Sequence, residues 1–225
     1  MRNVCAVITA AGLSSRMGEF KPLLPADGKV SMIQKEVETF SEAGISRIIV
    51  VTGFRAGDIE AELAGRDIEF VLNETYAESE MFDSVCIGLR QAICGRMVTD
   101  SAGRKSPGRM DFPAPETVLI TPVDVPLFSS DTVKRLMTSR GDICIPSDGR
   151  HGGHPLLLKK AVCEAVLRDS GTGGLKGALK RSGFETTYVA VDDPGSFIDF
   201  DTPNDYRKLQ ETFKEEWEKT TASNR

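Results

Sequence analysis

Residues 5–25 combine small residues and cations at a spacing that can bind phosphate. The β-branched run at 7–9 leads into small residues, which let the backbone approach an anion because at most a methyl group intervenes. Successive backbone N–H groups then form a nest for phosphate oxygens, and Arg16 with Lys21 supplies the cations that a polyphosphate needs. The segment predicts a triphosphate-binding loop. Its expected nucleotide contacts are Ala10, Ala11, Gly12, Ser14, Ser15, Arg16, Met17, Gly18 and Lys21.

The spacing excludes two familiar phosphate loops. A Walker A loop has four residues between its glycines and a Lys after the second, whereas here five residues separate Gly12 from Gly18 and Glu19 follows. A dinucleotide-binding turn needs a second glycine where this chain has Ser14. An ordinary glycine-rich turn is the alternative, but it gives no reason for Arg16 and Lys21 to accompany the glycines.

Asp124 is the first candidate metal ligand. It lies between Pro122 and Pro126 after a buried-strand pattern, so its backbone is stiff and cannot continue as a regular strand. Magnesium prefers one or two carboxylates together with substrate phosphates. A helix cap is the alternative role, although Ser130 or Asp131 is better placed to cap the helix that follows. The position favours a Mg²⁺ ligand.

A second acidic segment, I-D-F-D-T-P, occupies residues 198–203. In an extended segment Asp199 and Asp201 point to one side, and a cation is a common reason to tolerate two like charges there. A solvated acidic edge before the final helix is the alternative. Thr202 is the expected cap of that helix, with Pro203 in its first turn.

Polar groups also follow other predicted strands. The segment 73–85 opens a helix, and its hydroxyl groups, including those of Ser79 and Ser84, are suited to a pyrimidine edge. The alternative is a capping region with Asp83 or Ser79 as the cap. Residues 52–55 end another strand and are expected to wall the base pocket.

The segment R-H-G-G-H-P at 150–155 precedes a strand-like apolar run. Gly153 permits close backbone approach, and His154 is a candidate contact for a phosphate or a polar ring. A structural role for this histidine is the alternative.

Strand and helix patterns alternate along the chain, which predicts a mostly parallel sheet with helices on both faces. Because ligands bind beyond the carboxyl ends of such strands, the phosphate loop and Asp124 are expected to face one crevice. Residues 95–116 lack periodicity and are interpreted as a mobile insertion, and residues 219–225 as a frayed tail. The expected strands are 4–9, 47–52, 68–72, 117–121 and 186–191, and the expected helices 32–43, 58–63, 82–94, 131–138 and 203–219.

Composition limits the protein's class. A chain of 225 residues with 40% hydrophobic residues fits a single domain spanning 1–225. A net charge of -5 argues against nucleic-acid binding. No run approaches the ~20 apolar residues of a membrane span, and no signal peptide is recognised. The five cysteines form no C-x-x-C pair, so a cytoplasmic location is expected. Buried positions are expected for Cys5, Cys86, Cys144 and Cys163.

Taken together, these motifs resemble those of the molybdenum-cofactor nucleotidyltransferases. The loop A-A-G-x-S-x-R-M-G-x-x-K-P-L-L from residue 10 resembles their signature loop, and D-x-P at 124–126 resembles their metal aspartate. The stretches D-S-V-x-x-G-L at 83–89, G-H-P at 153–155 and D-F-D-T-P-N-D-Y at 199–206 are similar to segments of the cytidylyltransferases of this group. The resemblance covers most of the chain apart from 95–116 and the tail.

The resemblance implies a Rossmann-like nucleotidyltransferase fold and a Mg²⁺-dependent transfer of CMP from CTP to the terminal phosphate of molybdopterin, releasing pyrophosphate. It implies Arg16, Lys21 and Asp124 as catalytic residues, and Asp199 and Asp201 as further metal ligands. Gly153 and His154 are implied on the acceptor side, and a molybdenum hydroxylase as recipient of the product. The alternatives are guanylyl transfer, cytidylyl transfer to phosphocholine, a sugar phosphate or methylerythritol phosphate, and a catalytically silent nucleotide sensor.

Overall fold

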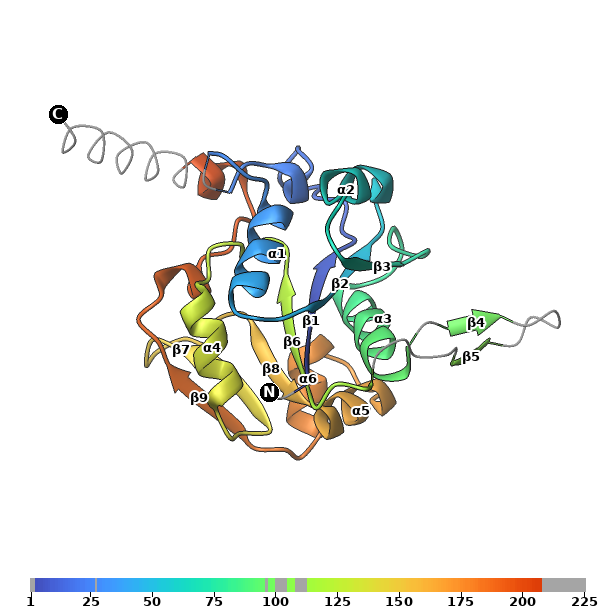
Figure 1. Ribbon diagram of the computed structural model, residues 1–225, viewed down its shortest axis with the longest axis vertical. Coiled ribbons are helices and arrows are strands. Elements are labelled where there is room, and N and C mark those ends of the chain that lie inside the picture. The colour runs from blue at the N-terminus through green and yellow to red at the C-terminus, as the bar shows by residue number, and fades with distance from the viewer. Residues whose placement is uncertain (1–2, 27, 96, 100–104, 108–112, 208–225) are drawn as a thin grey trace.

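A mostly parallel β-sheet with helices on both faces organises the protein (Figure 1). The computed structural model describes residues 3–26, 28–95, 97–99, 105–107 and 113–207. Seven strands pair in the order β3-β2-β1-β6-β8-β7-β9. Of these, β8 alone pairs antiparallel with its neighbours β6 and β7. The strands are β1 Val4–Ala10, β2 Arg47–Thr52, β3 Ile68–Leu72, β6 Thr117–Pro122, β7 Ile143–Ser147, β8 Leu156–Lys159 and β9 Thr186–Ala190.

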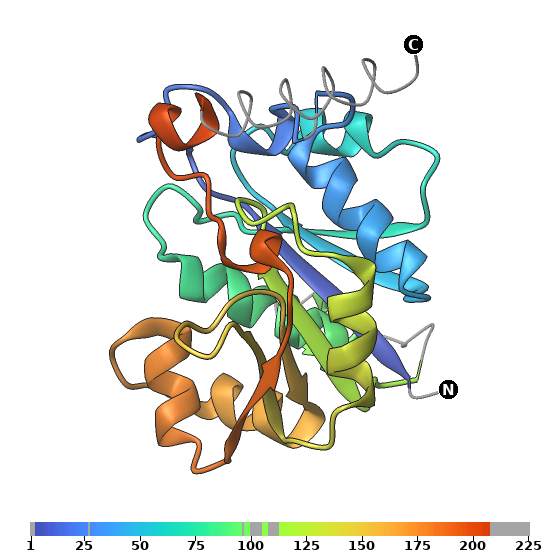
Figure 2. The same cartoon turned by 90° about the vertical axis from the view of Figure 1, so that its left-hand side faces the viewer.

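Two helical layers cover the sheet, and each has its own apolar core. Figure 2 shows α1 and α4 on one face and α3, α5 and α6 on the other. Alternate residues of β1 divide between the cores, as the two-residue period of a strand requires: Ile8 packs with α1, and Val7 with α3. The helices are α1 Met32–Glu42, α2 Ala56–Glu62, α3 Met81–Cys94, α4 Ser130–Thr138, α5 Lys160–Arg168 and α6 Gly174–Arg181, with 3₁₀ turns η1 Lys21–Leu23 and η2 Pro194–Phe197.

The direction of the strands brings distant segments to one edge of the sheet. Strands β1, β2, β3 and β6 are parallel, so the loops that follow them leave from the same edge. Since β8 runs the other way and pairs Leu156 with Ile120 near the end of β6, the segment before β8 reaches that edge too. The chain after β9 returns there, and the Phe200 N–H donates to the Asp124 carbonyl at 2.9 Å.

The expected fold class is confirmed. Each of the five expected strands and four of the expected helices forms within two residues of its predicted bounds. Ser31 and Gln34 form a capping box at the start of α1. Gly44 follows that helix at φ 89°, the left-handed backbone conformation that glycine commonly adopts just after a helix. The sequence-based list omitted β7 and β8 as sheet strands and α5 and α6 as helices.

Some predictions fall on residues outside the described ranges. Residues 96, 100–104 and 108–112 of the expected insertion and the whole 219–225 tail belong to this group, so the insertion and the tail stay predictions. Within the segment, β4 Met97–Thr99 pairs antiparallel with β5 Lys105–Pro107. The final helix begins as expected, with Thr202 and Asp205 exchanging cap hydrogen bonds, and residues 203–207 are helical.

Two local expectations need correction. Ser129, not Ser130 or Asp131, caps α4, because its hydroxyl accepts the Thr132 N–H. Cys86 is only half-buried, since it lies at the margin of the face that α3 packs against the sheet. Cys5, Cys144 and Cys163 are buried as expected, and burial raises the pKa of the Cys5 thiol to about 12.

The described helices include none that is both long and apolar enough to cross a membrane.

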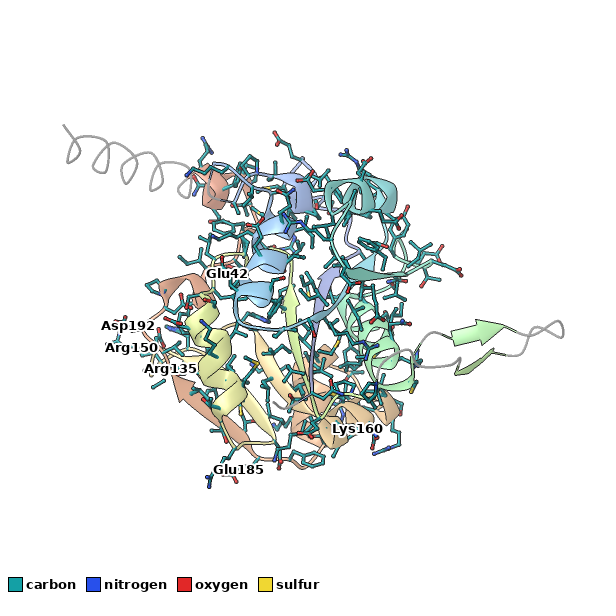
Figure 3. All side chains as sticks on the ribbon, viewed as in Figure 1. Glu42, Arg135, Arg150, Lys160, Glu185 and Asp192 are labelled. Atoms are coloured by element: carbon teal, nitrogen blue, oxygen red, sulfur yellow. The ribbon has the colours of Figure 1, made fainter. Side chains whose placement is uncertain are left out.

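At the outer edge of the sheet, Arg135 of α4 donates to the Ala190 carbonyl and so ties α4 to β9. Figure 3 shows Arg135 near Arg150 and Asp192 on this side of the molecule.

A buried acid interrupts the apolar face of α1. Glu36 has no exposed surface, and neither of its carboxyl oxygens has a hydrogen-bond partner among the described residues. Burial raises the pKa of Glu36 well above 4.5, and the negative charge of Asp124 adds to the increase. The core therefore favours the protonated, uncharged side chain.

We expect Glu36→Gln to stabilise the protein increasingly as pH rises. The folded pKa lies above the unfolded one, so the contribution of Glu36 is full below about pH 4.5 and is lost as pH rises toward the folded pKa. A glutamine cannot ionise and avoids this loss. Thermal melts between about pH 5 and pH 8 should show a growing advantage of the variant, with each kcal/mol worth roughly 2–4 °C in Tm.

Glu42→Gln is the matched control, because Glu42 is an exposed acid on the same helix (Figure 3). Its melting temperature should follow that of the wild type across the pH range. Parallel melting curves for Glu36→Gln and the wild type would contradict a buried, protonated Glu36.

Candidate functional site

The loop after β1 lines a cavity at the carboxyl edge of the sheet. Residues 9–16 contribute to its wall. Ser14 adopts φ 54°, and its hydroxyl accepts the Lys21 N–H at 3.1 Å, which closes the loop. Gly18 also has positive φ, at 74°, a conformation in which glycine avoids the steric cost of a Cβ. Gly18 therefore suits its backbone conformation, while the close approach of this loop to a phosphate stays a prediction.

Lys21 is the electrostatic centre of this cavity. Its side chain is only 11% exposed, and its Nζ atom lies 3.2 Å from Asp124 Oδ2 and 2.7 Å from Asp201 Oδ1. Arg16 Nη1 contacts the other oxygen of Asp201 at 3.0 Å. The hydrogen bond from Lys21, with the positive charges of Lys21 and Arg16, holds the pKa of Asp201 below its ordinary value. The structure thus brings both predicted cations to two of the predicted carboxylates.

The same two carboxylates suit a divalent cation. Asp124 and Asp201 each aim one oxygen at a single positive atom, and paired carboxylate oxygens are the ligands that Mg²⁺ and similar hard ions take in proteins. Asp199, the third predicted metal ligand, is exposed and makes no ion pair among the described side chains. Asp124 and Asp201 therefore form the candidate metal-binding pair.

Gly153 and His154 precede β8, which pairs with β6, and they lie outside the cavity lining. The His154 N–H donates to the Ser196 carbonyl at 2.8 Å, and an added Cβ at Gly153 would approach that carbonyl to 2.3 Å. Burial lowers the pKa of His154, although the charges of Asp124 and Asp199 oppose the shift. Its Nδ1 atom is buried without a partner among the described residues. The His154 imidazole therefore favours its neutral form, although the charge of Asp124 reaches it.

The opposite end of the cavity carries few charges. Ser79 and Ser84 line it together with Tyr76, Glu80 and Met81. Both predicted serines accept hydrogen bonds from Asn73 Nδ2, at 2.9 Å and 3.0 Å. Helix α3 is capped by Glu80, with Asp83 completing the capping box, instead of by Asp83 or Ser79. This leaves the Ser79 hydroxyl at the cavity wall.

Met17, Gly18 and the segment 52–55 were also expected at the site but lie outside the cavity lining. Met17 is buried, and neither it nor Gly18 reaches the cavity lining. The segment 52–55 supports the loop from behind instead of lining the base end: an added Cβ at Gly53 would approach the Ala11 carbonyl to 2.7 Å, and the Phe54 N–H donates to that same carbonyl.

The sequence analysis included Asn73 and Tyr76 in the segment 73–85 but gave neither an individual role in this site. Asn73 is 1% exposed and directly follows β3, a position that the strand-end rule could have singled out. Tyr76 lines the cavity and contacts Phe54, with ring centroids 6.2 Å apart.

Comparison with known proteins places this geometry among nucleotidyl transferases. Residues 6–187 match the family described as MobA-like NTP transferase domain. The Escherichia coli protein named molybdenum cofactor cytidylyltransferase is 26% identical over 220 residues, which cover 96% of this chain and all of that protein.

Solved structures share the fold over nearly the whole chain. A nucleotidyl transferase from Methanothermobacter superposes with a TM-score of 0.73 at 26% identity, covering 94% of this chain and 98% of the other. A Mycobacterium tuberculosis protein solved in complex with manganese gives a TM-score of 0.66 at 23% identity, covering 93% and 98%.

We expect Lys21→Met to tighten the binding of Mn²⁺ to the nucleotide-free protein at least about tenfold. The ammonium group occupies the point on which Asp124 and Asp201 converge, so its removal frees two carboxylates that repel each other and attract a cation. Titration of Mn²⁺ followed by electron paramagnetic resonance measures this affinity.

Lys159→Met is the matched control, since Lys159 pairs with Asp142 on the surface at 2.8 Å with both side chains about 40% exposed. It should leave Mn²⁺ affinity unchanged. Equal Mn²⁺ affinities for Lys21→Met and the wild type would show that the two carboxylates do not form a metal site.

Proposed function

Because this chain belongs to the MobA-like NTP transferase domain family, we propose that it moves CMP from CTP to the terminal phosphate of a molybdopterin-type cofactor and releases pyrophosphate. The observation that carries the proposal is the meeting of Arg16 and Lys21 with Asp124 and Asp201 at one end of a single cavity. The name of the Escherichia coli relative supports the cytidylyl donor and the cofactor acceptor.

The charged end of the cavity suits the triphosphate. Arg16 is largely exposed and Lys21 largely buried, so one cation can follow the phosphates while the other holds a fixed position. Backbone N–H groups of residues 11–16 would bind the β- and γ-phosphate oxygens together with these two cations. The site would thereby stabilise the pyrophosphate that departs.

The chemistry requires one bond to form as another breaks. An oxygen of the acceptor phosphate attacks the α-phosphorus in line, and the bond to the bridging oxygen of the β-phosphate breaks, so pyrophosphate carries away the electron pair. Catalysis of such transfers depends mainly on positioning and on electrostatic stabilisation. Lys21 would neutralise the leaving group after it exchanges its contacts with Asp124 and Asp201 for phosphate oxygens.

Asp124 and Asp201 would hold Mg²⁺. When bound, this ion supplies Lewis-acid stabilisation of the charge that two mutually repelling phosphates bring together. Manganese in the Mycobacterium tuberculosis structure supports a divalent ion in this fold.

His154 and Gly153 would bind the acceptor. Burial favours the neutral form of His154, so it would contact the acceptor as a polar ring without adding positive charge. The close approach of Gly153 to the segment after β9 keeps this loop near the reacting phosphates. We further propose a cytoplasmic reaction whose product passes to a molybdenum hydroxylase.

A screen of pyrophosphate release tests the proposed reaction. CTP, GTP, ATP and UTP are each combined with Mg²⁺ and with molybdopterin, phosphocholine, a sugar phosphate or methylerythritol phosphate. We expect release with CTP and molybdopterin, because the acceptor and the base end must both be filled. Preference for GTP would point to guanylyl transfer, preference for a small phosphate to another acceptor, and binding without release to a nucleotide sensor.

Lys21→Ala and Asp124→Ala should each lower turnover at least about a hundredfold while the fold survives, since one well-placed electrostatic group in such sites is worth roughly 3–4 kcal/mol. Steady-state turnover, with circular dichroism as the folding check, measures this. Lys180→Ala and Asp131→Ala are the controls: both change exposed helical positions and should keep full activity. Near-normal turnover in either folded site variant would remove its proposed role.

A further inference from the structure

Asn73 holds a defined orientation beneath the hydroxyl end of the cavity, which Ser79 and Ser84 line. Its Oδ1 atom accepts the Thr75 backbone N–H and the Thr75 hydroxyl, both at 3.1 Å. A backbone N–H can only donate, so the oxygen of the amide must face Thr75. The amide nitrogen must then face Ser79 and Ser84, as observed.

This orientation determines the direction of two serine hydroxyls. Each Ser oxygen accepts a hydrogen from Asn73 Nδ2, and a hydroxyl has one hydrogen of its own to donate. The part of the chain that the structure describes offers no acceptor for either hydroxyl hydrogen. Both serines line the cavity, so their hydrogens are available to a ligand there.

We propose that Asn73 is a positioning residue that makes Ser79 and Ser84 a pair of hydrogen-bond donors, and that this pair selects cytosine by its N3 and O2 acceptors. The inference rests on the proposed function and deepens it. Tyr76 and Met81 at the same end offer the aromatic and apolar surface that a flat base needs.

The polarity of the bases explains the selection. Cytosine presents two adjacent acceptors, N3 and O2, to which two hydroxyls can donate. Uracil has an N–H at position 3, and guanine presents N–H groups at N1 and N2, so a donor would meet a donor. An unpaired polar group in a closed site is penalised more than a missing bond, and the donor pair therefore discriminates against both bases.

Reversing the polarity of residue 73 tests this assignment. In Asn73→Asp a carboxylate replaces the amide, and Thr75, Ser79 and Ser84 surround it with donors, which favour the charged form. The serine hydrogens then point to Asp and their lone pairs face the cavity. By calorimetry with Mg²⁺ and without acceptor, we expect CTP affinity to fall at least about tenfold and its preference over UTP to disappear.

A ligand lacking one acceptor gives a second measurement. In 3-deaza-CTP a C–H group replaces N3, so the wild type should bind it about tenfold more weakly than CTP, as expected for one lost hydrogen bond. Asn73→Asp should bind the two nucleotides equally, because the donor to N3 has gone. A merely structural effect would weaken both nucleotides by the same factor and preserve their ratio.

Asn3→Asp is the matched control. It makes the same change in charge at the opposite edge of the sheet, where the Asn3 amide contacts the carbonyls of Pro113 and Ala114, and its nucleotide preferences should equal those of the wild type. Should Asn73→Asp not fold, the double variant Ser79→Ala/Ser84→Ala provides the test and should also bind CTP and 3-deaza-CTP equally.

Persistent discrimination in these variants would overturn the role of Asn73 and the two hydroxyls. So would a wild type that binds CTP and 3-deaza-CTP equally, and in that case the proposed transfer reaction would still stand. Failure of the wild type to bind any of the four nucleoside triphosphates would overturn the proposed function together with this inference.

Discussion

The ammonium group of Lys21, shared between the carboxylates of Asp124 and Asp201, is the interaction on which the site depends. Its three residues come from the turn after the β1 loop, from the segment just after β6 and from the segment that follows β9. They meet because parallel strands deliver their loops to one edge and because the chain after β9 returns to that edge, where Phe200 is anchored on the Asp124 carbonyl. Without Lys21 the two carboxylates would repel each other, so the nucleotide-free site needs a cation of its own.

The cavity has a charged end, which Arg16, Lys21, Asp124 and Asp201 line, and a hydroxyl end, which Ser79 and Ser84 line. At the charged end, the proposed reaction has Lys21 exchange its two carboxylates for phosphate oxygens, which would make the carboxylates available to a metal ion. At the other end, the Asn73 amide donates to Ser79 and Ser84, and we propose that it thereby sets which hydrogen-bonding groups face the base. Both ends are supported from behind by close packing, as at Gly53, where any Cβ would press on Ala11. Rigid support of this kind keeps reacting groups in position.

The sequence was sufficient to predict the sheet, most helices and the charged end of the site, because β-branched runs, capping residues and cations close to glycines are local signals. It could not show that Lys21 contacts Asp201, 180 residues away, since that contact depends on the return of the chain after β9. The list of expected strands left out β7 and β8, although the run after residue 155 was interpreted as strand-like, and their directions in the sheet follow from tertiary pairing. Glu36 was missed for a similar reason: the spacing of Ile33, Val37 and Phe40 predicts a helix, but not a carboxyl group inside its buried face. The individual role of Asn73 was not predicted, because an asparagine after a strand also suits an ordinary turn.

The most direct test of this account is a crystal structure of the protein with Mn²⁺ and a non-hydrolysable CTP analogue. The account predicts an anomalous manganese signal between Asp124 and Asp201, with the Lys21 ammonium displaced onto the β- or γ-phosphate. It is contradicted if Lys21 keeps both carboxylates while the nucleotide binds elsewhere, or if the manganese ion lies away from Asp124.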